Sequence, residues 1–195
     1  MPYTIEHKQK TRERIVSCAR EVFNRKGFLE ASIDDIMAQA GLTRGGFYSH
    51  FESKDDLFAE VIEAFGRCNA TDRWDDVEFD PSLNGRAMAS QAVQAYLSRS
   101  HLNDIGGHCP MIALLADIAR AGPRVKKAGR GLLESLSAML AAGRTEAGDP
   151  QARDRGLALA ALCIGGMVLA RAFDDPCFRD EIRDATRTTA LELIG

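Results

Sequence analysis

Residues 32–58 read SIDDIMAQAGLTRGGFYSHFESKDDLF, and the spacing of their polar residues predicts three closely spaced helix starts. Ser32 and Asp35 have the separation of a capping box, in which a hydroxyl and a carboxylate satisfy each other's backbone N–H groups. Thr43 and Ser53 are two further hydroxyl caps, each ahead of another helical stretch. Because a short helix, a glycine-containing turn and a second short helix follow in order, the stretch predicts a helix-turn-helix.

The second helix of this motif would begin at Arg44 and would fit a DNA major groove about 12 Å wide. Gly45 and Gly46 each cost roughly 1 kcal/mol of helix propensity relative to alanine. Their bare backbone would let the helix approach DNA closely, and a frayed helix end is the alternative interpretation. Arg44 is best suited to a bidentate contact with guanine, and Phe47 and Phe51 are predicted core residues. The neighbouring groups that can bind phosphate are Thr43, Tyr48, His50 and Lys54.

The composition of the 195-residue chain predicts an all-α protein. The helix-turn-helix motif would form an N-terminal domain, and the helical patterns after it a larger C-terminal domain. Helix-forming residues dominate, aromatic residues make up only 7%, and there are 6 prolines. A domain boundary is predicted within the fourth helix, which gives domains at residues 1–56 and 57–195. Further helical patterns cover residues 9–26, 86–100, 111–121, 123–142, 151–173 and 178–194.

Charge is distributed unevenly along the chain. The net charge is −3, but residues 1–27 hold seven Lys or Arg and three acids, a local charge of +4 that leaves −7 for the remainder. This asymmetry favours a local DNA site over a sequence-tolerant architectural protein, which needs broad release of counterions.

The five cysteines are widely spread and contain no C-x-x-C pair, so neither a disulfide framework nor a zinc site is predicted. A reducing cytoplasm fits this pattern, and no cofactor or metal is expected. The N-terminus is charged, unlike a signal peptide. The longest uncharged apolar stretch, residues 157–170, is too short to cross a membrane and indicates a buried helix.

The run GLTRGGFYSHFESKDDLF at 41–58 resembles the N-terminal domain of the TetR family of bacterial transcriptional regulators, and the likeness extends over residues 11–66. The resemblance implies a homodimer whose paired recognition helices bind a palindromic operator as a repressor. It also implies that a small-molecule effector in the larger domain releases the DNA.

Several residues match positions of functional importance in the family. Arg44 and Gly45 fall where family members touch bases. The resemblance implies phosphate contacts for Tyr48 and His50, and an anchoring role for Lys54. Ser32 and Thr43 resemble the family's hydroxyls at helix starts. A basic arm beside the DNA would contain Lys8, Lys10 and Arg12, with a solvated surface as the alternative.

Residues 157–170 are apolar on all sides, which predicts burial against more than their own domain. Together with the last helix they would form half of a four-helix dimer interface, and an intrachain core is the alternative. The predicted interface residues are Leu157, Ala161, Ile164, Gly165, Val168, Ile182 and Leu191.

The predicted effector site combines flexible methionines with aromatic residues, which suits a small hydrophobic ligand. Its candidate residues are Phe65, Trp74, Tyr96, Cys109, Met111, Met139, Met167 and Arg171. An alternative regulator would sense oxidants or electrophiles through Cys109, which follows His108. The competing hypothesis is a small-molecule-binding enzyme. Against it, the sequence contains no catalytic triad order, nucleotide fingerprint or metal-ligand cluster.

Overall fold

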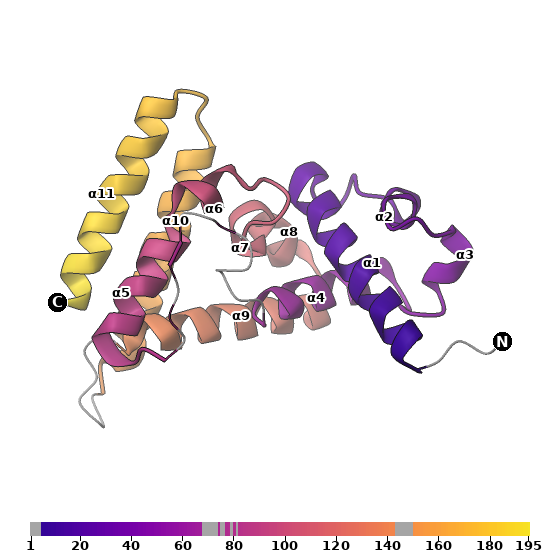
Figure 1. The fold of residues 1–195 in the computed structure, drawn as a ribbon, viewed down its shortest axis with the longest axis horizontal. Helices are drawn as coiled ribbons and strands as arrows, with labels where there is room; N and C mark the ends of the chain where they lie inside the picture. Colours follow the sequence, from indigo (N-terminus) through magenta and orange to yellow (C-terminus); the bar gives the residue numbers. More distant parts are fainter. Residues whose placement is uncertain (1–4, 68–73, 75–76, 79, 81, 143–149) are drawn as a thin grey trace. The chain divides into compact units, whose positions relative to one another are not determined.

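The computed structural model describes residues 5–67, 74, 77–78, 80, 82–142 and 150–195, and its regular structure there is entirely helical. This confirms the predicted all-α class. None of the helices in these ranges is long and apolar enough to cross a membrane. Figure 1 labels the helices, which are α1 (Ile5–Lys26), α2 (Ile33–Gln39), α3 (Arg44–Phe47), α4 (Lys54–Phe65), α5 (Gly85–Tyr96), α6 (Arg99–Asn103), α7 (Pro110–Ala113), α8 (Leu115–Arg120), α9 (Pro123–Ala141), α10 (Ala152–Arg171) and α11 (Pro176–Ile194).

The chain forms two compact units, residues 1–67 with 105–130 and residues 68–104 with 131–195. The functional boundary predicted at 56/57 falls inside α4, whereas all of α4 belongs to the first unit. Residues 105–130, which the sequence places in the larger domain, also pack in the first unit. The units describe packing, and the functional boundary stays a prediction.

The first unit is built around α1, which packs against α2, α4 and α7. Its core is aromatic: Phe23, Phe47 and Phe58 are fully buried, and Phe51 is only 2% exposed. The Phe23 and Phe58 rings meet edge to face with centroids 5.3 Å apart. Burial of Phe47 and Phe51 confirms their predicted core position and fixes α3 against the rest of the motif.

Specific polar contacts hold residues 105–130 in the first unit. The Asn24 side-chain amide donates to the carbonyl oxygens of Gly106 and His108, each at 2.9 Å. Arg124 pairs through Nη1 and Nη2 with the two carboxylate oxygens of Glu63. These partners lie more than 60 residues apart in the chain, so periodicity alone gives no sign of them.

In the second unit α10 packs against α11 and α6, and α11 also packs against α5. Figure 1 shows α10 and α11 running side by side. Two glycines permit close helix packing. A Cβ added at Gly156 would overlap the Ser137 carbonyl oxygen of α9, and one added at Gly166 would overlap the Thr186 side chain of α11.

Several predicted helices have different limits in the structure. The first begins at Ile5 rather than at residue 9, and local caps change the limits of two others. The helix predicted over 86–100 is interrupted, since the Ser98 hydroxyl accepts the His101 N–H at 3.0 Å and starts α6. The helix predicted over 111–121 is divided at Leu114 into α7 and α8. The last helix begins at Pro176 rather than at 178, because the Asp175 carboxylate accepts the N–H groups that follow and proline suits the first helical position.

Candidate nucleic-acid interface

The predicted caps at Ser32 and Ser53 are confirmed. The Ser32 hydroxyl accepts the Asp35 N–H at 3.0 Å, and the Asp35 carboxylate accepts the Ser32 N–H at 3.2 Å. These hydrogen bonds from Ser32 lower the pKa of Asp35. The Ser53 hydroxyl accepts the Asp56 N–H at 3.1 Å and starts α4. Thr43 precedes α3, but its side chain makes no capping bond and its hydroxyl is not used there.

The turn between α2 and α3 needs Gly41, which has a φ of +65° in the left-handed region. The outward face of α3 is uncovered. A Cβ at Gly45 would meet nothing within 4 Å, and Tyr48 is 59% exposed. A Cβ at Gly46 would meet the Met37 methyl at 3.6 Å, which is ordinary van der Waals contact. The two glycines therefore have different surroundings.

Arg44 is positioned at the exposed surface by a carboxylate from α2. Its Nη1 lies 2.6 Å from Oδ2 of Asp34, and both side chains are more than half exposed. Asp34 raises the pKa of Arg44, and interaction with Tyr48 contributes to the same upward shift. The side chains of Asp34, Arg44 and Tyr48 therefore form one polar cluster on the surface of the motif, which we call the recognition cluster.

Lys54, the first residue of α4, makes hydrogen bonds to the loop that precedes α2. Its ammonium group donates to the carbonyl oxygens of Phe28 at 2.8 Å and Ala31 at 3.0 Å. It also lies 4.3 Å from the centroid of the Phe28 ring. Because an ammonium group has three donors, one remains for a DNA phosphate. The sequence suggested only the contact with DNA and missed the contacts with the loop before α2.

Replacing Lys54 with methionine is expected to lower the free energy of unfolding by about 1–2 kcal/mol, because two carbonyl oxygens lose a charged donor. Urea unfolding measures this change. Lys10→Met is the control, since Lys10 pairs with Glu6 at an exposed site and should change stability by less than about 0.5 kcal/mol. Equal stability of Lys54→Met and wild type would show that the two carbonyl contacts do not contribute.

Arg12 differs from its predicted place in a basic arm. Its guanidinium binds both carboxylate oxygens of Glu60 and donates to the His50 carbonyl oxygen. It also stacks 4.0 Å from the centroid of the Phe51 ring. Arg12 therefore joins α1 to α4 and to His50 and Phe51, which follow α3. Lys8 and Lys10 remain exposed.

His50 follows α3 and is half-buried. Burial lowers its pKa, and the positive charges of Lys8 and Arg12 lower it further. Its buried Nδ1 atom has no hydrogen-bond partner among the described residues.

The predicted effector residues are divided between the two units. Phe65, Cys109 and Met111 belong to the first unit, and the other five belong to the second, namely Trp74, Tyr96, Met139, Met167 and Arg171. Within the second unit, Trp74 stacks on His101 at a centroid distance of 4.2 Å, and Tyr96 meets the same ring edge to face at 4.9 Å. The sequence did not identify His101 as the centre of this aromatic cluster.

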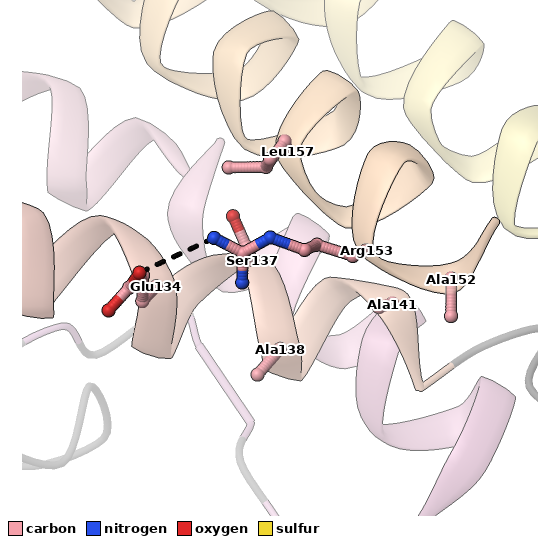
Figure 2. Close-up of a pocket in the computed structure, with 7 residues that line it drawn as sticks. All are labelled: Glu134, Ser137, Ala138, Ala141, Ala152, Arg153 and Leu157. Atoms are coloured by element: carbon pink, nitrogen blue, oxygen red, sulfur yellow. Dashed lines mark hydrogen bonds and ion pairs between the residues drawn. The ribbon is translucent and has the colours of Figure 1, made fainter. Parts of the chain in front are cut away.

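Described residues of the second unit line a cavity between α9 and α10 and another between α5 and α11, and none of the eight candidates lines either of them. One cavity, of about 250 Å³, lies between α9 and α10, where Arg153 pairs with Glu134 at 3.4 Å. Figure 2 labels the residues that line this cavity. The other, of about 520 Å³, is polar and lies between α5 and α11, where Arg183 and Leu191 contribute to its wall. The effector site thus stays a prediction.

Cys109 is 1% exposed and lies just before α7. Reactive cysteines occupy partly exposed positions, so this burial does not favour the sensor alternative. Cys68 lies outside the described residues, and no disulfide joins the four described cysteines to one another. No group of three or more potential metal ligands occurs among the described residues.

The predicted dimer residues also differ in their surroundings. Ala161 is exposed, and a Cβ added at Gly165 would meet nothing within 4 Å. Ile164 is only 6% exposed and packs within its own unit. The exposed side of α10 continues through Leu169, at 55% exposure, to Phe173, whose ring meets that of Phe178 at 5.0 Å.

Comparisons with known proteins match the part of the chain that contains the helix-turn-helix. Residues 15–61 match the family described as bacterial regulatory proteins, tetR family. The transcriptional regulator YfiR of Bacillus subtilis is 40% identical over 60 residues, which are 31% of this chain and 29% of YfiR. The regulator TtgW of Pseudomonas putida is 39% identical over 98 residues, which are 50% of this chain and 69% of TtgW.

Similarity of fold extends over nearly the whole chain. A TetR-family regulator structure from Agrobacterium tumefaciens is 23% identical, has a TM-score of 0.67, and is matched over 95% of this chain and 97% of its own. The sequence matches concentrate on the helix-turn-helix and cover under a third of YfiR. These relatives carry the names of transcriptional regulators, a class distinct from enzymes. On these matches and this fold, the chain belongs to the TetR family.

Proposed function

We propose that the chain is a DNA-binding transcriptional regulator that binds a palindromic operator as a homodimer. The observation that carries this proposal is the uncovered outward face of α3. Phe47 is fully buried while Tyr48 is 59% exposed, and the backbone at Gly45 is open. A short helix with one face packed in a core and a bare, polar opposite face has the form that enters a major groove.

The side chains around α3 divide into two roles. Arg44 would read a guanine edge, because a guanidinium matches its two acceptors. Tyr48, His50, Lys54 and the free hydroxyl of Thr43 would bind phosphates and fix the orientation of the motif. Ser32 would act locally, because its hydroxyl is already engaged in the capping box.

We expect the dimer to form through the exposed side of α10 and α11, with Ala161, Gly165 and Val168 near the two-fold axis. Close approach at Gly165 is possible because no other part of its own unit occupies that space. The remaining predicted interface residues are Leu157, Ile182 and Leu191, which are half-buried within one chain, and Ile164, which is only 6% exposed there. Repression in the cytoplasm and release by a small hydrophobic effector are part of the same proposal.

Selection from a randomised duplex library tests the proposal. Purified full-length protein should enrich an inverted repeat, and Arg44→Ala should relax the preference at one base pair of each half-site by roughly 1–3 kcal/mol. Enrichment of no sequence would contradict site-specific binding, whereas equal weakening at every position would contradict the role of Arg44 in reading a base.

Gly45→Ala should change protein stability and DNA affinity in opposite directions. Alanine is expected to stabilise the helix by up to about 1 kcal/mol, because the added methyl group meets nothing in the chain. The same methyl group should weaken binding of the selected duplex, because it would stand between α3 and the DNA. Thermal unfolding and fluorescence anisotropy measure the two effects.

Gly46→Ala is the matched control for this pair of measurements. Its methyl group would rest in ordinary contact on Met37, away from DNA, so affinity should stay at the wild-type value. A loss of affinity in Gly46→Ala but not in Gly45→Ala would contradict the proposal, because DNA would then contact the side of α3 that faces Met37.

A further inference from the structure

The carboxylate of Asp34 lies in the recognition cluster beside the side chain expected to read a base. Asp34 is the second residue of α2, and Arg44 is the first residue of α3. Oδ2 of Asp34 accepts from Nη1 of Arg44 at 2.6 Å, a short and charge-assisted contact. The two helices are adjacent elements of the motif, so this contact crosses the turn between them.

This contact leaves most of the guanidinium available. A guanidinium carries five N–H donors in a planar fork, and Asp34 accepts from only one of its nitrogens. The remaining donors can make a bidentate contact with O6 and N7 of guanine. Both side chains are exposed, at 60% for Arg44 and 58% for Asp34, so the pair is open to a ligand in solution.

A carboxylate in this position has two effects on recognition. It restricts the rotamers of a long, flexible side chain before DNA arrives, so less freedom is lost on binding. It also opposes the approach of phosphates, because like charges repel. Both effects reduce the affinity of Arg44 for DNA backbone relative to its affinity for a base edge.

We propose that Asp34 is a positioning residue that directs Arg44 to a guanine and thereby sets base preference. The inference rests on the proposed DNA-binding function. It differs from a purely structural role, in which the acidic side chain only stabilises the N-terminal turn of α2. Such a role would change the stability of the motif but would leave the preferred base unchanged.

The test compares full-length wild type with Asp34→Ala, Arg44→Ala and the double variant. Each protein selects from the same randomised duplex library, and its affinity is then measured on the wild-type duplex and on its single-base variants. Asp55→Ala is the control, because it removes an exposed acidic side chain from the first turn of α4 without touching Arg44. Circular dichroism and thermal unfolding verify that each variant is folded.

Asp34→Ala is expected to lower the preference for guanine about fivefold or more, at the same base pair that Arg44→Ala affects. Its affinity for non-cognate duplexes should stay equal or rise, because a negative charge is removed. The double variant should show the base preference of Arg44→Ala alone, since the two residues act through one contact. Asp34→Asn, which keeps the shape without the charge, should give an intermediate preference, and Asp55→Ala should leave the preference unchanged.

An unchanged base preference in Asp34→Ala would overturn the inference while leaving site-specific binding intact. Relaxation at a different base pair would also overturn it, because Asp34 would then contact a base itself. Failure of the wild-type protein to enrich any sequence would instead contradict the proposed function.

Discussion

Gly156→Ala is expected to lower the free energy of unfolding by about 2–3 kcal/mol, which corresponds to a fall in Tm of about 5 °C or more. The added Cβ would overlap the Ser137 carbonyl oxygen and lie 3.0 Å from the Ala141 Cβ. A backbone carbonyl cannot rotate away as a flexible side chain does, so α9 and α10 must move apart. Figure 2 shows these two helices close together beside their shared cavity. Urea and thermal unfolding measure the loss.

Gly131→Ala is the matched control on α9. Its Cβ would meet nothing within 4 Å, so the substitution should stabilise the helix by up to about 1 kcal/mol. Opposite signs for the two glycine-to-alanine changes are expected. Equal or greater stability of Gly156→Ala would show that the α9 and α10 backbones are farther apart than the structure places them.

Ala161→Glu should convert the dimer to a monomer and reduce operator affinity by roughly 100-fold or more. Ala161 is exposed in the single chain, so glutamate should not disturb its folding. In the proposed interface, however, the two-fold axis would bring two glutamates together in an apolar contact, where neither charge has a partner. Sedimentation velocity measures the oligomeric state, and fluorescence anisotropy measures binding to the selected duplex.

Ala138→Glu provides the control, because Ala138 is an exposed alanine on α9, outside the predicted interface. This variant should remain dimeric and bind the duplex as wild type does. A dimeric Ala161→Glu protein with unchanged affinity would place the interface elsewhere, and a monomeric protein with unchanged affinity would show that dimerisation is not needed for binding.

Local features of the sequence were sufficient to predict the helix-turn-helix. The capping residues Ser32 and Ser53 act within three residues of their partners, and Phe47 and Phe51 form the packed side of the second helix. At Ser98, by contrast, the sequence predicts an uninterrupted helix from periodicity over residues 86–100, and the structure has a hydroxyl cap there. Where capping and periodicity conflict, the structure follows the cap.

Contacts between distant residues could not be predicted from one sequence. Arg12 binds Glu60 48 residues away, and Asn24 binds a carbonyl oxygen 82 residues away. Nothing in the composition of either segment identifies its partner. The neighbours Gly165 and Gly166 illustrate the same limit, because one faces open space and the other faces Thr186.

Fluorescence anisotropy with footprinting on the intergenic DNA beside the gene of this protein tests the central claim most directly. Scrambled DNA of equal length at the same salt concentration is the reference, because electrostatic binding to any sequence depends strongly on salt. We expect a footprint centred on an inverted repeat and an affinity at least about 1,000-fold above that for scrambled DNA. Equal binding to both DNAs, with no protected region, would contradict site-specific recognition by α3.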